Sequence, residues 1–130
     1  MSSPFLDAPE SEWLASNDLA FAVRDNFPVS SGHALVCPRR LVPTWDEATR
    51  EERIALLDLV EELRALLNET HHPDGFNIGV NIGVAAGQGV MHLHVHVIPR
   101  YVGDVLDPRG GVRHIIPNTG RYAPVAEPDA

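Results

Sequence analysis

A strict alternation of apolar and polar residues predicts a β-strand over residues 91–100. Two sets of residues alternate there, with Leu93, Val95 and Val97 falling between His92, His94 and His96. Successive side chains of a strand point to opposite faces, so this period of two gives the segment two chemically different sides. We expect the apolar set to face a core and the three histidines to form a row on the other face.

The remaining pattern predicts further strands and one long helix. Apolar runs of the kind typical of strands, at 19–25, 33–38 and 76–82, predict three strands. A last short strand is expected near 112–116. Apolar residues at helical spacing predict a helix over 50–68, with Thr49 as N-cap and Glu52 completing a capping box. Its expected core-facing stripe is Ile54, Leu57, Val60, Leu63 and Leu67, widened by Leu56, Leu59 and Leu66.

These elements predict an α+β fold, in which one long amphipathic helix packs on an antiparallel sheet of about five strands. A chain of 130 residues with 44% hydrophobic content fits a single domain. We expect residues 1–17 to form an irregular N-terminal segment and residues 105–130 to form an extended C-terminal tail.

Composition and charge narrow the function classes. The net charge of −8 argues against a sequence-independent nucleic-acid partner, which would need a basic surface. No run approaches the ~20 apolar residues of a membrane span, and the N-terminus lacks a signal-peptide pattern. Cys37 is the only cysteine and cannot form an internal disulfide, so we expect no membrane association and a cytoplasmic location.

Three histidines in alternation indicate chemistry rather than packing alone. Imidazole is largely neutral near pH 7 and can act as a nucleophile, a proton carrier or a metal ligand. A purely structural, hydrogen-bonded role remains the alternative for any one of them. A zinc site is a second alternative, although positions i, i+2 and i+4 of a strand span too far for all three to reach one ion easily.

The histidine strand also resembles a family motif. The run His92-Leu93-His94-Val95-His96-Val97-Ile98 matches the pattern His-φ-His-φ-His-φ-φ, with φ apolar, of the histidine-triad (HIT) family of nucleotide hydrolases and transferases. Further matches follow in family order at residues 26–28, 31–38, 81–83 and 87–88, so the resemblance covers residues 18–104.

The resemblance implies cleavage of a nucleoside phosphate bond through a covalent nucleotidyl-His94 intermediate, which releases AMP or another nucleoside monophosphate. The substrate would be a dinucleoside polyphosphate or a nucleoside phosphoramidate. His92 and His96 would donate to phosphate oxygens or to the leaving group, and His33 would be a fourth site histidine close to His92. The resemblance further implies a homodimer that uses the long helix and a sheet edge. We expect no cofactor to be required, although a divalent metal could accompany the substrate phosphates.

The family pattern also assigns nucleotide-binding positions. Asp25 would bind the ribose hydroxyls, Asn81, Gln88 and the Gly89 amide would contact phosphate, and Phe21, Val23 and Leu35 would wall the base slot or belong to the core. Arg109 and Arg113 in the tail would favour an anionic polyphosphate, or they are solvated surface charges.

Two positions depart from the family pattern. Leu41 replaces a common histidine, which argues with the missing Cys-x-x-Cys pair against a structural zinc. Gly89 replaces a common Ser or Thr, which leaves open a nucleotide-binding protein with little catalysis.

Overall fold

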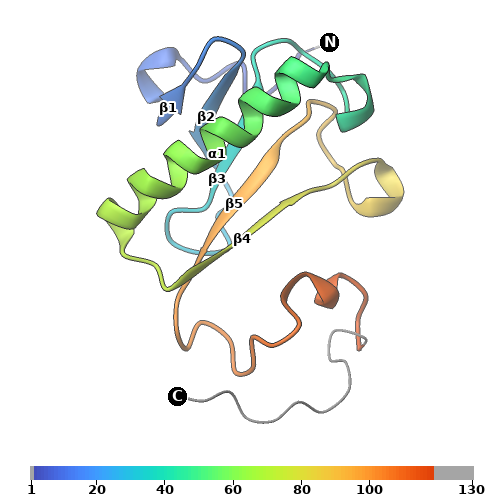
Figure 1. Ribbon diagram of the computed structural model, residues 1–130. Helices are drawn as coiled ribbons and strands as arrows, with labels where there is room; N and C mark the ends of the chain where they lie inside the picture. The colour runs from blue at the N-terminus through green and yellow to red at the C-terminus, as the bar shows by residue number, and fades with distance from the viewer. Residues whose placement is uncertain (1, 119–130) are drawn as a thin grey trace.

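The structure is a computed structural model, which describes residues 2–118. Five antiparallel strands form one sheet in the order β1-β2-β3-β5-β4 (Figure 1). The strands are β1 (Ala15–Ser16), β2 (Ala20–Arg24), β3 (Ala34–Pro38), β4 (Gly75–Val80) and β5 (Val95–Arg100). This confirms the α+β prediction. Residues 119–130 of the predicted tail lie outside the described residues.

A single long helix, α1 (Arg50–His71), crosses one face of the sheet (Figure 1). It begins with the predicted capping box, since Thr49 and Glu52 exchange side-chain to backbone hydrogen bonds. The helix runs three residues further than predicted, to His71. Its core-facing side is Leu56, Leu59, Val60, Leu63 and Leu67. Ile54 and Leu57 of the predicted stripe lie at its margin, 47% and 53% exposed.

The second face of the sheet has a core of its own. Phe21, Val23, Leu35 and Cys37 form this cluster, and Phe5, Ala8 and Trp13 pack against it from the N-terminal segment. That segment is therefore more ordered than the irregular stretch predicted for residues 1–17. It contains a 3-10 turn (η1, Glu10–Glu12) and strand β1, which pairs with β2.

Two predicted strands differ in the structure. Strand β5 begins at Val95 rather than near Met91, because the segment before it leaves the ladder and Leu93 N–H donates to Val42 O at 2.8 Å in the loop after β3. The expected strand near 112–116 is instead a 3-10 helix, η4 (Gly111–Ile115). Gly110 before it has φ +95°, which suits a turn rather than a strand.

Within residues 2–118, no helix combines the length and apolar character required to cross a bilayer.

Candidate active site

The middle histidine of the predicted row is hydrogen-bonded to the backbone through one ring nitrogen, which leaves the lone pair of the neutral ring on the other. His94 Nδ1 lies 2.7 Å from the backbone carbonyl oxygen of His92. A carbonyl can only accept, so Nδ1 carries the proton and Nε2 of the neutral ring keeps its lone pair. His94 also lines a cavity of about 180 Å³, which we call the nucleophile cavity. The residue thus has the tautomer that a nitrogen nucleophile requires.

The first histidine is not part of an open row. His92 is 0% exposed and both of its ring nitrogens are bonded. Nε2–H donates to Pro38 O at 2.8 Å, so Nδ1 must accept the proton of the Ser3 hydroxyl at 2.6 Å. The expectation that His92 donates to substrate oxygens is therefore not met in this structure, because burial and these two bonds leave it no free donor.

The third histidine is bonded to the fourth. His33 Nε2 lies 2.9 Å from His96 Nδ1, which corrects the expectation that His33 lies beside His92. The cause is the register of the sheet, since β3 pairs Leu35 with His96 on β5 while His92 lies outside the ladder.

The protons of this pair can be assigned from one backbone group. Val29 N–H donates to His33 Nδ1 at 3.1 Å, so a neutral His33 carries its proton on Nε2 and donates it to His96 Nδ1. His96 then carries its own proton on Nε2. Asp25 Oδ2, at 3.3 Å from His33 Nε2, supports the same direction.

Burial keeps these rings uncharged. It lowers the pKa of His33, His92 and His96 below the usual value, and for His33 the nearby Asp25 carboxylate offsets part of that effect. For His96 the neighbouring His94 and His33 lower the pKa further. These three imidazoles are therefore neutral at pH 7 and act as hydrogen-bond partners rather than as cations.

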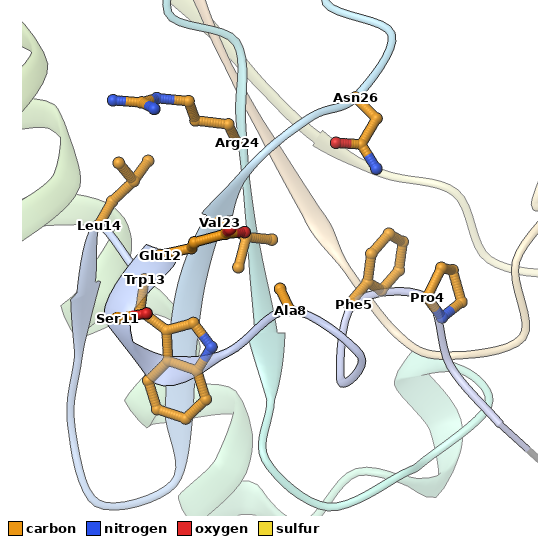
Figure 2. A pocket seen from close by; sticks show the side chains of 10 residues that line it. All are labelled: Pro4, Phe5, Ala8, Ser11, Glu12, Trp13, Leu14, Val23, Arg24 and Asn26. Carbon is orange, nitrogen blue, oxygen red and sulfur yellow. The ribbon is translucent and has the colours of Figure 1, made fainter.

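Three cavities lie around His94 and His96. The nucleophile cavity at His94 continues toward a larger cavity of about 520 Å³, the outer cavity, which shares with it Pro4, Phe5, Arg24 and Asn26. Figure 2 shows Pro4 and Phe5 at one end of the outer cavity and Trp13 at the other end. The Asn26 amide is directed toward this cavity. A third cavity of about 270 Å³, the His96 cavity, is lined by His33 and His96. Space for a bound group therefore exists on either side of the histidines.

The residues expected to hold the nucleoside are divided between these spaces. Asp25 and Leu35 line the nucleophile cavity, and Val23 lines the outer cavity. Phe21 lines neither of them, since it is 0% exposed and stacks on Trp13 at a centroid distance of 4.6 Å. Trp13 therefore stands at the edge of the outer cavity where Phe21 was expected (Figure 2).

The residues expected to contact phosphate differ in their availability. Asn81 lines the His96 cavity. Gln88 is 4% exposed and its amide is fully engaged, donating to Pro43 O and Val90 O and accepting from Gly83 N–H. Gly89 is exposed, and a Cβ at this position would meet no atom within 4 Å. Gln88 thus braces the loop before the triad in this structure, whereas Gly89 and Asn81 face open space.

The tail arginines give no support to a polyphosphate site. Arg109 makes a bidentate ion pair with Asp107, at 3.0 Å for each bond, and Arg113 lies on the exposed η4 helix. The guanidinium of Arg109 is thus already matched to a carboxylate of its own chain.

The donor set does not fit a metal at the triad. The three imidazoles do not converge, because His92 is bonded to Ser3 and Pro38 and His96 Nδ1 is bonded to His33. Asp25, His33 and His96 do present ligand atoms within 4.8 Å of one another. However, the Val29 N–H keeps the His33 proton on Nε2, so that nitrogen has no lone pair for a metal. We interpret the cluster as a hydrogen-bonded relay.

Sequence reasoning missed the N-terminal contribution to this site. Ser3 bonds to His92 across 89 positions, and the Phe5 ring lies 4.9 Å from that of His94. Neither residue belongs to a periodic pattern. An apolar Phe5 ahead of β1 was the only signal, and it did not specify a partner.

Comparisons with known proteins agree with this geometry. The family model described as "HIT domain" matches residues 8–103. A bis(5'-adenosyl)-triphosphatase of Dictyostelium discoideum is 37% identical over 91 residues, covering 70% of this chain and 61% of its own length. An AP-4-A phosphorylase of Mycobacterium tuberculosis is 34% identical over 109 residues, covering 79% and 56%. The matches span less than two thirds of these relatives.

A solved structure shares the fold. A zinc-bound histidine triad family protein from Mycobacterium smegmatis superimposes with a TM-score of 0.73 at 31% identity, covering 82% of this chain and 81% of that one.

Proposed function

The chain belongs to the HIT domain family, and on that premise we propose that it hydrolyses a nucleoside phosphate bond through a covalent nucleotidyl-His94 intermediate. The observation that carries the proposal is the hydrogen bond from His94 Nδ1–H to the His92 carbonyl, because it gives the neutral ring its lone pair on Nε2 in a residue that lines a cavity. The names of two relatives, a bis(5'-adenosyl)-triphosphatase and an AP-4-A phosphorylase, support an adenosine polyphosphate as the substrate, and the first of them supports hydrolysis.

In the first step, the His94 Nε2 lone pair attacks the α-phosphorus of the nucleotide. A nitrogen–phosphorus bond forms while the bond from phosphorus to the bridging atom breaks, and the bridging electron pair departs with the leaving group. The Nδ1–H bond to the His92 carbonyl stabilises the positive charge that develops on the imidazole. In the second step, water attacks phosphorus, the nitrogen–phosphorus bond breaks, and the nucleoside monophosphate leaves as the water proton passes to solvent.

The hydrogen bond from His33 to His96 determines what His96 can donate to the leaving group. His33 Nε2–H fixes the His96 proton on Nε2, from which a neutral imidazole donates a hydrogen bond but does not readily give up its proton. A hydrogen bond suffices for an oxygen leaving group that departs as an anion, whereas an amine needs a full proton. This favours a dinucleoside polyphosphate as substrate over a nucleoside phosphoramidate.

The cavities suggest how the substrate lies. We assign the nucleoside to the nucleophile and outer cavities, which Asp25, Val23 and Leu35 line, and the leaving group to the His96 cavity with Asn81. No step in this scheme uses a metal or an organic cofactor. Activity should therefore survive EDTA treatment, apart from any effect on metal paired with the substrate phosphates.

We also propose a homodimer. Strand β4 has β5 as its one neighbour among the described strands, and Ile78 on it is 40% exposed. The outer side of α1 exposes Ile54 and Leu57. The open β4 edge with its exposed Ile78 fits pairing with a second copy, whereas Ile54 lies toward the opposite edge of the sheet, near Asn17 and Leu19. Sedimentation of wild type and Ile78→Lys tests this, and a wild-type monomer would contradict it.

The function is tested by incubating the protein with diadenosine tetraphosphate and with an adenosine phosphoramidate, beside His94→Ala. We expect AMP from the tetraphosphate, a slower release from the phosphoramidate, and no turnover by the variant. Binding of both compounds without turnover by wild type would instead support a nucleotide-binding protein with little catalysis.

A further inference from the structure

The carbonyl that orients the nucleophile lies outside the sheet. Strand β5 begins at Val95, so the His92–Leu93 peptide has no partner in the ladder. Its N–H side is held by Val42 O, at 2.8 Å from Leu93 N, and its carbonyl faces His94 Nδ1. The position of this peptide therefore depends on what anchors residue 92 itself.

The side chain of His92 is anchored at two points. Its Nε2–H donates to Pro38 O at the end of β3, and its Nδ1 accepts from Ser3 Oγ in the N-terminal segment. Ser3 is 1% exposed and His92 is 0% exposed, so no water can replace either partner without rearrangement. The ring is thus clamped between two segments that are distant in the sequence.

The Ser3 hydroxyl is itself oriented. Its oxygen accepts Phe5 N–H at 3.2 Å, which directs the hydroxyl proton toward His92 Nδ1. The same turn places the Phe5 ring at centroid distances of 5.8 Å from His92 and 4.9 Å from His94, at the end of the outer cavity (Figure 2). One short segment therefore holds His92 and covers one side of His94.

We propose that Ser3 is a positioning residue for the nucleophile, acting through His92 on the carbonyl that holds the His94 tautomer. This inference rests on the proposed role of His94. Ser3 touches neither the substrate nor the reacting nitrogen. Its hydroxyl keeps His92 in the Nε2–H form that bonds Pro38. His92, held in this way, places its carbonyl oxygen where His94 Nδ1–H donates to it.

The test compares Ser3→Ala, which removes the donor, with Ser3→Thr, which keeps a hydroxyl, and with Ser2→Ala as the matched control at an exposed neighbouring serine. Loss of one buried hydrogen bond should lower the kcat of Ser3→Ala about five- to tenfold and leave KM within about twofold of wild type. Ser3→Thr should recover most of the loss, and Ser2→Ala should match wild type. Wild-type kcat in Ser3→Ala, or an equal loss in Ser3→Thr, would overturn the proposal.

A second readout does not depend on activity. Nitrogen-15 NMR of the imidazoles should place the protons on Nε2 of His92 and Nδ1 of His94 in wild type, and Ser3→Ala should broaden or shift both signals. Unchanged His94 signals would overturn the role of Ser3 whether or not the enzyme turns over. Conversely, a wild type without turnover but with the expected NMR response would contradict the proposed function and leave the clamp standing.

Discussion

His94 donates its Nδ1–H to the carbonyl oxygen of His92, two residues earlier, at 2.7 Å. The acceptor is a backbone atom, so no choice of side chain at position 92 removes it. Side chains decide instead where that carbonyl stands. Both bonds of the buried His92 ring hold that residue in place, and His94 lines the nucleophile cavity.

Replacing His33 should weaken leaving-group departure. In His33→Leu, His96 Nδ1 loses its donor and can take up the proton, which then leaves the Nε2 position that faces the leaving group. We expect kcat to fall about tenfold or more, the size of a lost charge-stabilising hydrogen bond in a transition state. Steady-state kinetics should show a larger loss for substrates with poor leaving groups than for those with good ones.

His72→Asn serves as the control for that variant, because His72 is an exposed histidine with φ +51°, a conformation that Asn tolerates. It should match wild type. A loss in His33→Leu that is equal for all leaving groups would argue against the relay.

Restoring a hydroxyl at position 89 should raise activity. A Cβ on Gly89 would meet no atom within 4 Å, so Gly89→Ser fits without displacing a neighbour. One added hydrogen bond to the phosphate or leaving group should raise kcat/KM about three- to tenfold. Gly89→Ala is the matched control, since it adds the carbon without the donor. Equal rates in the two variants would show that the hydroxyl does not reach the substrate.

The free energy of unfolding should fall as the pH falls below 6.5. Burial lowers the pKa of His33, His92 and His96 in the folded chain, while in the unfolded chain each histidine regains its usual value near 6.5. Below that pH the unfolded chain binds more protons, so acid favours unfolding, whereas above it the neutral rings contribute no pH dependence.

Urea unfolding at a series of pH values between about 5.5 and 7.5, above the range of most carboxylates, measures this slope. His92→Gln should show a shallower dependence even though its overall stability is lower. A wild-type curve that is flat across this interval would contradict the buried, neutral state of the three rings.

Periodicity was enough to predict most of the fold. The capping box of Thr49 and Glu52 predicted the start of α1, and apolar runs predicted β2, β3 and β4 to within two residues of their bounds. These signals are local, so a short stretch of sequence contains them. Leu93 shows the limit, because its alternation with the histidines is that of a strand although its N–H bonds to a loop.

The site depended on contacts that no local pattern encodes. The bond between Ser3 and His92 joins positions 89 apart, and the neighbour of His33 was decided by the β3–β5 register. Gln88 illustrates a third case, since an amide can serve a ligand or its own backbone equally well. In this structure the Gln88 amide is hydrogen-bonded to three backbone groups.

The central claim is a covalent bond between His94 and the nucleotide. Rapid acid-free quenching of wild type during turnover of diadenosine tetraphosphate, followed by mass spectrometry of the peptides, measures it directly. We expect the peptide containing His94 to carry one adenylyl group, with no adduct in His94→Ala. Turnover by wild type without any adduct at His94, or turnover by His94→Ala, would contradict it.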